Sequence, residues 1–353
     1  MNKPISSALF VWGTGFPPSR TRIRRPPGKS GARADPRSGW ENAAIGDLLD
    51  KRLAFVTGKG GVGKTTVAYA LGLASAAAGR RTIVCEVASQ HRGPGLFGRA
   101  AKPGEQRLAK GLWTISVDPD AAVREYLQVQ LPVRAMGALL QRSRLFNYLT
   151  AATPGLREMV TMGKIWELAQ DRRRDPGAKR TYDAVIVDAP ATGHGVAFLQ
   201  TPRNFRELAR VGPIARQASQ IERTVGDPAQ TGVAVVARGE EMAVNESIEL
   251  EAALRGDDER PGFAVERIYV NGLYPERFNP EERERIRSLA TRAAPPAAGP
   301  LRAAAREAER ASEQRAQAER LRSATSAPLT ELPFVFAPRL GAAELQRLSE
   351  ALA

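Results

Sequence analysis

The chain has 353 residues, 42% of them apolar, and a formal net charge of +14 at pH 7. That length accommodates one large α/β domain or two ordinary ones. A single cysteine, Cys85, excludes an internal disulfide and any paired-cysteine metal site, and with His91 and His194 as the only histidines a zinc site is not expected.

Half of the net positive charge lies near the amino terminus. Residues 1–40 carry eight lysines and arginines against a single aspartate, in a segment rich in proline, glycine and serine. We predict a disordered basic tail over residues 1–44, or an upstream extension that the cell does not translate, and a folded domain over residues 45–353. Because the excess charge belongs to the tail, nucleic acid is not the expected partner. No apolar run approaches the roughly 20 residues of a membrane span, and the cysteine content suits the cytoplasm.

The first predicted strand, Leu53–Thr57, leads into a glycine-rich loop of sequence GKGGVGKTT. Residues 58–65 satisfy the phosphate-loop pattern G-x-x-x-x-G-K-[ST], whose backbone amides surround phosphate oxygens, and a helix is predicted over Val67–Ala78. In this pattern Lys64 contacts the β and γ phosphates and the Thr65 hydroxyl binds Mg²⁺. The residues expected to bind a nucleotide here are Gly58, Lys59, Gly60, Gly61, Val62, Gly63, Lys64, Thr65 and Thr66.

Further apolar runs alternate with helical or loop segments and predict the remaining strands. They are Thr82–Val87, Leu112–Val117, Asp183–Val187, Val233–Ala237, Val265–Val270 and Leu332–Phe336. Continuous apolar strands separated by helices are typical of a parallel sheet covered on both faces. The sequence therefore predicts an α/β fold of the P-loop NTPase type, with a mostly parallel sheet of about seven strands. A helical insertion is predicted at about residues 121–171, and its methionines and aromatics either pack in the core or line a groove.

The strand Asp183–Val187 ends in the sequence DAPATGHG, which begins at Asp188. An aspartate at the end of an apolar strand is the usual partner of a phosphate loop, and it binds Mg²⁺ directly or through a water. The following residues, Pro190, Thr192, Gly193 and His194, lie where the γ-phosphate is expected and are candidates for a switch that senses hydrolysis. The alternative is a strand end followed by a capped helix start.

With these motifs, the chain resembles the arsenite-pump and tail-anchored-protein-targeting ATPases, a group of dimeric P-loop ATPases of the SIMIBI class. The likeness rests on motifs in the family's order from about residue 50 to the end: KGGVGKTT at 59–66, TPGLREMVTMGKI at 153–165, DAPATGHGVAFLQTP at 188–202, YVNGLYPE at 269–276 and LPFVFAPRLGAAELQRLSEAL at 332–352. It implies an ATP-hydrolysing dimer, either a homodimer or a heterodimer with a related subunit. It also implies a protein client or a membrane-protein partner, and hence a cytoplasmic location with peripheral membrane contact through that partner.

The resemblance assigns roles to individual residues. Lys59 is the extra lysine of the deviant Walker A loop, which in this group crosses the dimer interface to the partner's nucleotide and acts in catalysis with Lys64. Asn271 would read adenine, which an asparagine amide can do through N6 and N7, although Asn-Gly is also a strong turn signal. Pro338 lies in the loop that would close over the base.

The sequence departs from the family pattern after the second strand. The family's Asp-Pro-Ala-His stretch is absent, and Glu86 is the nearest carboxylate, either a catalytic base or a structural acid; His91 is a second candidate. Because Cys85 stands alone, neither an arsenite site nor an inter-subunit zinc site can be built. Because the positioning of the base contributes much of the rate at such sites, the missing family aspartate leads us to expect slow or partner-dependent hydrolysis. The alternative functions are a nucleotide-bound scaffold or regulatory subunit with little turnover, or, less favoured, a chromosome- or septum-positioning ATPase.

Overall fold

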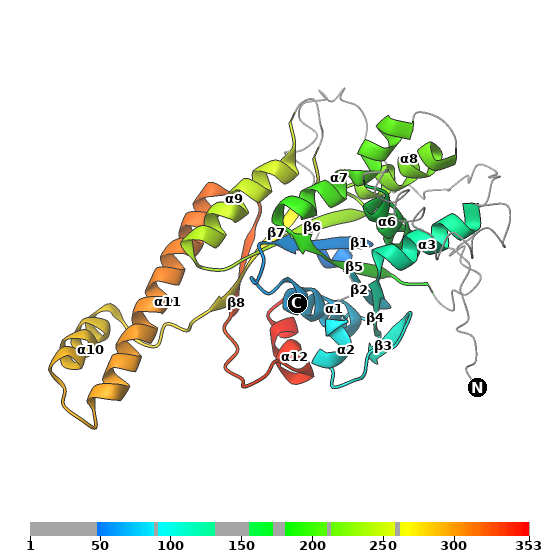
Figure 1. Ribbon diagram of the computed structural model, residues 1–353. Coiled ribbons are helices and arrows are strands. Elements are labelled where there is room, and N and C mark those ends of the chain that lie inside the picture. Colours follow the sequence, from blue (N-terminus) through cyan, green and yellow to red (C-terminus); the bar gives the residue numbers. More distant parts are fainter. Residues whose placement is uncertain are drawn as a thin grey trace, which may run out of the picture.

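The computed structural model describes residues 48–87, 91–130, 155–171, 181–209, 213–257 and 262–352. Within them, eight strands form one sheet in the order β3-β4-β2-β5-β1-β6-β7-β8 (Figure 1), and every neighbouring pair except β3–β4 is parallel. The strands are β1 (Leu53–Gly58), β2 (Thr82–Val87), β3 (Gln106–Ala109), β4 (Leu112–Val117), β5 (Ala184–Ala191), β6 (Thr231–Ala237), β7 (Val265–Leu273) and β8 (Leu329–Pro333). The prediction of an α/β fold with a mostly parallel sheet is confirmed.

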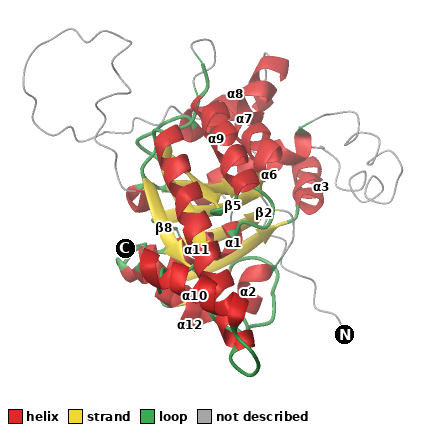
Figure 2. Ribbon diagram, turned by 90° about the vertical axis from the view of Figure 1, so that its left-hand side faces the viewer, coloured by secondary structure: helices red, strands yellow, loops and turns green. Residues whose placement is uncertain are grey.

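Helices cover both faces of the sheet (Figure 2), as its continuous apolar strands require. The helices are α1 (Lys64–Ala77), α2 (Arg92–Leu96), α3 (Pro119–Gln130), α6 (Leu156–Leu168), α7 (Thr192–Ala209), α8 (Pro213–Val225), α9 (Glu241–Arg255), α10 (Pro280–Arg292), α11 (Ala298–Ala324) and α12 (Ala342–Glu350), with a short 3-10 turn, η1 (Leu48–Asp50). One core cluster joins the sheet to α1 and α12, and the other joins it to α6, α7, α9 and α11. The sheet is thus the middle of three layers.

The central strand β1 lies between β5 and β6, and all of its residues are buried. Its partners run parallel to it, so the carboxyl ends of β1, β5 and β6 meet at one edge of the sheet. From β1 the chain crosses to β2, which lies on the β5 side of β1. From β5 it crosses to β6, which lies on the opposite side of β1. Ligands of open α/β sheets bind beyond the carboxyl ends at such a point, and this is where the predicted phosphate loop lies.

Several strands differ from the sequence prediction, and two of them only in length: β5 continues past its predicted end to Ala191, and β7 continues past its predicted end to Leu273. Strand β3 was missed, because a four-residue edge strand with the polar sequence QRLA carries no apolar run. It turns back antiparallel on β4 through Gly111, whose φ is 74°. Strand β8 lies at Leu329–Pro333, three residues before the predicted range, because Phe334 and Phe336 leave the sheet to pack with Tyr274. Their apolar character serves this aromatic cluster rather than a strand.

The predicted tail (1–44) and the middle of the predicted insertion (residues 131–154) lie outside the described residues. At the two ends of the insertion the structure has helices, α3 and α6. The predicted apolar residues of α6 are buried in the core cluster above the sheet: Met159, Met162, Ile165, Trp166 and Leu168. Of the two interpretations of these side chains, core packing is therefore the one that the structure shows. The Trp166 indole also donates to Thr224 Oγ1 at 3.0 Å, which ties α6 to α8.

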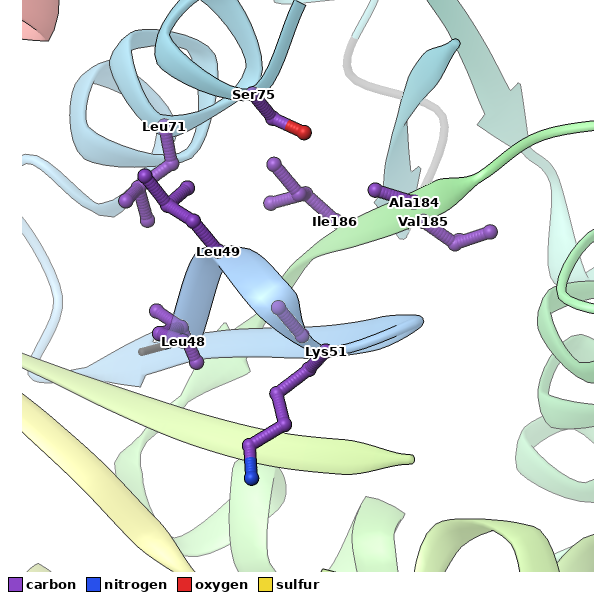
Figure 3. Close-up of a pocket in the computed structure, with 9 residues that line it drawn as sticks. Leu48, Leu49, Lys51, Leu71, Ser75, Ala184, Val185 and Ile186 are labelled. Atoms are coloured by element: carbon purple, nitrogen blue, oxygen red, sulfur yellow. The ribbon is translucent and has the colours of Figure 1, made fainter. Parts of the chain in front are cut away.

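A small apolar cavity lies at the amino-terminal edge of the sheet, between η1 and α1 (Figure 3). Leu48, Leu71 and Ile186 are among its lining residues, and its volume of about 10 Å³ is room for roughly one water molecule. The Lys51 ammonium leaves it to pair with Glu266 at 2.9 Å. The cavity is too small for a nucleotide and lies at the opposite end of the strands from the phosphate loop.

The central position of β1 predicts a large cost for removing a side chain from it. Phe55 is fully buried and packs edge-on against Phe198 of α7, with ring centroids 6.5 Å apart. We expect Phe55→Ala to lower the free energy of unfolding by about 3–5 kcal/mol, measured by urea denaturation. Leu208→Ala, at a side chain that is 75% exposed, is the control and should change it by less than about 0.5 kcal/mol. Equal losses in the two variants would contradict this account of the core.

Candidate functional site

Three glycines give the phosphate loop its shape. Gly58, Gly61 and Gly63 have φ values of 146°, 83° and 97°, in the region that side chains disfavour. A Cβ on Gly58 would lie 2.2 Å from the carbonyl oxygen of Val236, so the loop leaves β1 in close contact with β6. Cβ atoms on Gly60 and Gly61 would meet nothing within 4 Å, so the tip of the loop is open. The loop ends where α1 begins, at Lys64, and the positive end of that helix faces the loop.

The two lysines of the loop are both bonded within the chain. Lys64 Nζ donates to the backbone oxygen of Lys59 at 2.9 Å. Burial lowers the pKa of Lys64, and the nearby charge of Asp188 acts in the opposite direction. Lys59 Nζ forms an ion pair with Glu246 of α9 at 2.6 Å. Both ammonium groups therefore lie at the loop, and each is held by a group that a phosphate could replace.

Thr65 and Asp188 come together beside the loop. The Thr65 hydroxyl donates to Asp188 Oδ2 at 2.6 Å, which joins the first turn of α1 to the end of β5. Burial raises the pKa of Asp188 to about 6, and the charge of Glu86 adds to the rise, while Thr65, Lys64 and Arg92 oppose it. A hydroxyl and a carboxylate at this place are the oxygen ligands that Mg²⁺ prefers.

Glu86 lies on β2 directly opposite Asp188 of β5 in the parallel register. Its side chain is 2% exposed, and its carboxylate accepts three hydrogen bonds: from the Tyr69 hydroxyl at 2.7 Å, from Gly93 N at 2.6 Å and from Arg92 N at 3.0 Å. The carboxylate thus fixes the start of α2 against β2. Of the two roles considered for Glu86, this geometry is that of a structural acid.

Tyr69 and Gly93 complete this arrangement and were missed in the sequence. The Tyr69 hydroxyl oxygen is also 2.6 Å from Thr114 Oγ1. A Cβ on Gly93 would lie 1.8 Å from the same hydroxyl oxygen of Tyr69. Burial raises the pKa of Tyr69, so the phenol stays protonated and donates. The available signal was a tyrosine inside an otherwise apolar helix, because a buried phenol needs a partner. His91 is exposed and has a φ of 45° just before α2.

Asn271, at the end of β7, reaches the phosphate loop. Its Nδ2 donates to the backbone oxygen of Val62 at 2.9 Å, and a Cβ on Gly63 would lie 2.2 Å from the same nitrogen. In this structure the amide supports the loop, and its Oδ1 remains as an acceptor. Pro338 lies in an exposed bend after β8, beyond the aromatic cluster of Tyr274, Phe334 and Phe336.

The predicted switch residues form the junction of β5 and α7. Pro190 belongs to β5, whereas Thr192, Gly193 and His194 form the start of α7, and the His194 side chain is exposed. The junction packs closely on β1: Thr57 Oγ1 donates to the Pro190 oxygen at 3.3 Å, and a Cβ on Gly195 would lie 2.5 Å from Thr57 Oγ1. In this conformation the alternative, a strand end followed by a helix start, describes the backbone.

Among the residues that the structure describes, no three histidine, cysteine, aspartate or glutamate side chains lie close enough together to hold a metal ion. None of the described helices is both long enough and apolar enough to cross a membrane.

Comparisons with known proteins agree with this geometry. The model of the anion-transporting ATPase family matches residues 51–219, which include the phosphate loop, β2 and the β5–α7 junction. The chain is 30% identical over 250 residues to ATPase BagA of Mycobacterium tuberculosis, covering 69% of this chain and 70% of BagA. It is 29% identical over 180 residues to ATPase GET3 of Kluyveromyces lactis, covering 46% of this chain and 51% of that protein. The resemblance inferred from the sequence motifs is confirmed, and the chain belongs to the anion-transporting ATPase family.

Proposed function

We propose that this chain binds ATP with Mg²⁺ at the carboxyl end of β1, hydrolyses it, and couples the nucleotide state to a dimer. Membership in an ATPase family supports the reaction class. The observation that carries the proposal is the convergence of Lys64, Thr65 and Asp188 beside an open phosphate loop. This grouping combines a phosphate-binding ammonium with oxygen ligands for the metal.

In this proposal each group has one task. Amides of residues 58–66 bind the phosphate oxygens, with the start of α1 directed at them. Lys64 contacts the β and γ phosphates in exchange for the Lys59 oxygen. Thr65 and Asp188 hold Mg²⁺, Asp188 through a water, and the bound ion would neutralise charge that develops between the β and γ phosphates. Asn271 and Pro338 bind the adenine, with the Asn271 Oδ1 facing N6.

We further propose a dimer in which Lys59 contacts the partner's triphosphate, as the family resemblance implies. The partner is a second copy or a related ATPase subunit. Pro190, Thr192, Gly193 and His194 would form the switch, since the β5–α7 junction lies directly against the end of β1. A protein client or membrane protein would read the dimer state, and the expected location is the cytoplasm, with peripheral membrane contact through that partner.

A second function is favoured by the surroundings of Glu86. Its carboxylate already accepts three hydrogen bonds, from Tyr69, Arg92 and Gly93. A general base has to reach the attacking water, and a carboxylate held in this way is poorly placed for it. The alternative is therefore a nucleotide-bound scaffold or regulatory subunit with little turnover, which pairs with a related ATPase.

The two loop lysines should separate binding from dimer-dependent turnover. Because Lys64 contacts phosphate within its own chain, Lys64→Ala should weaken ATP binding about 10- to 100-fold in calorimetry, the range for a lost charged hydrogen bond. Lys59→Ala should leave ATP binding within about twofold but lower steady-state phosphate release at least about tenfold, because the lost contact is on the partner. Lys110→Ala, in an exposed turn, is the control and should change neither. Unaltered turnover in Lys59→Ala would contradict the dimer, and no phosphate release by the unaltered chain would favour the scaffold.

The raised pKa of Asp188 predicts how Mg²⁺-dependent binding responds to pH. A carboxyl with a pKa of about 6 in the empty site is ionised at pH 7.5 and mostly protonated at pH 5, and it must lose its proton to act as a metal ligand. As the pH falls from 7.5 to 5, the Mg²⁺-dependent part of ATP binding should weaken by about tenfold, because pH 5 lies one unit below the pKa of Asp188. Asp188→Asn is the control, because it retains only the titration of the nucleotide itself. Identical pH profiles would contradict the role of Asp188.

Glu86→Gln distinguishes the structural acid from the base. An amide places a donor toward Tyr69 or a backbone N–H, so we expect a loss of about 1–3 kcal/mol in the free energy of unfolding, measured by urea denaturation. Tyr69→Phe, which removes the hydroxyl between Glu86 and Thr114, should destabilise the chain in the same direction. A Glu86→Gln chain that is fully stable but has lost its turnover would instead identify Glu86 as the base.

A further inference from the structure

The ion pair between Lys59 and Glu246 joins the tip of the phosphate loop to α9. Strands β1 and β6 are paired up to Gly58 and Val236, and α9 begins four residues after β6 ends, at Glu241. The close contact at Gly58 therefore brings the first helix after β6 beside the loop. Glu246, in the second turn of α9, reaches Lys59 Nζ at 2.6 Å.

Helix α9 is a fixed support for this carboxylate. Val244, Leu250 and Leu254 are buried in the core cluster above the sheet. Near its carboxyl end the helix is also tied to Ser326, which follows α11: the Arg255 guanidinium donates to Ser326 Oγ at 2.8 Å, and Ser326 Oγ donates to Glu251 Oε1 at 3.0 Å. The side chains of Lys59 and Glu246 are 34% and 32% exposed, so the pair lies at the surface of the loop, where a second protein can reach it.

Lys59 cannot serve Glu246 and a second triphosphate at once without sharing its charge. In the proposed dimer the ammonium extends to the partner's phosphates, whereas in the single chain it is folded onto Glu246. The exchange gives up the ion pair between Lys59 and Glu246, and it leaves the Glu246 carboxylate near the partner's triphosphate with its own charge less well balanced. Both effects set Glu246 against the dimer.

We propose that Glu246 is a positioning residue that retains Lys59 within its own protomer, and that it thereby weakens ATP-dependent association with a second copy of this chain. This inference rests on the proposed function, because it needs a partner triphosphate for Lys59 to reach. Lys59 exchanges its ion pair with the Glu246 carboxylate for one with that triphosphate, and no covalent bond is made or broken. The retention favours a dimer of two loaded protomers, in which an anion is present to displace each carboxylate.

The test is the dissociation constant of the dimer, measured by sedimentation velocity with Mg²⁺ and a slowly hydrolysed ATP analogue. Glu246→Gln should tighten the dimer by roughly two- to tenfold, because the competing carboxylate is gone while the side-chain shape is kept. Glu249→Gln is the matched control: it removes an exposed carboxylate from the same helix and should leave the constant unchanged. With Lys59→Ala in the background, Glu246→Gln should give no tightening.

A second measurement reads the pair in the single chain. Without nucleotide, the Lys59 amine should react faster with an acylating reagent in Glu246→Gln than in the unaltered chain, as followed by peptide mass spectrometry, and Glu249→Gln should not change the rate. The proposal is overturned if Glu246→Gln leaves the dimer unchanged or weakens it, if the tightening persists without Lys59, or if the acylation rates are equal. If the unaltered chain binds the analogue but does not self-associate, both this proposal and the homodimer fail. If it binds no nucleotide, the proposed function itself fails.

Discussion

The hydrogen bond between Thr65 and Asp188 is the interaction on which the site depends. It fastens the first turn of α1 to β5, and so it fixes the phosphate loop, which runs from β1 to α1, relative to the sheet. It also places an ionisable carboxyl where burial disfavours its charge, which is why the pKa of Asp188 rises. Keeping that carboxyl ionised at pH 7 costs the folded chain about 1 kcal/mol for each unit of the rise. A bound cation would remove the cost, which supports the proposed Mg²⁺ site.

Glu86, on the neighbouring strand, is a second buried carboxylate, and the chain surrounds it differently. The two carboxylates stand opposite one another on β2 and β5, and the charge of Glu86 contributes to the raised pKa of Asp188. Asp188 is half-buried and accepts a hydrogen bond from Thr65 at the end of the loop, whereas Glu86 is enclosed by the Tyr69 hydroxyl and by two amides at the start of α2. One carboxylate is thus available to a ligand, and the other holds the wall of the site.

Local patterns predicted the parts of the site that are local in the chain. The loop from Gly58 to Thr66 was readable because its glycines, its lysine and the following helix are consecutive. In contrast, the register that sets Glu86 opposite Asp188 is a property of strand pairing, which no single segment encodes. The contact of Glu246 with Lys59 could not be predicted either, because it depends on the pairing of β1 with β6. Nothing in the sequence of α9 distinguishes Glu246 from the other exposed acids of that helix.

Ligand-binding groups of the loop are occupied by the chain itself. Lys64 is bonded to a loop carbonyl, Lys59 to Glu246, and the Asn271 amide to Val62. Each contact holds a side chain near the place where its proposed ligand would be, which reduces the ordering that binding requires. Each contact also has to be exchanged, so the affinity is the difference between two sets of bonds. The exchange at Lys64 involves a neutral carbonyl, and the exchange at Lys59 involves a full charge. In the proposed function, ATP binding by one protomer would therefore meet little resistance, whereas the step that recruits the second protomer would be opposed by Glu246. That ordering, loading before pairing, is what a dimer needs if its assembly is to report the nucleotide state.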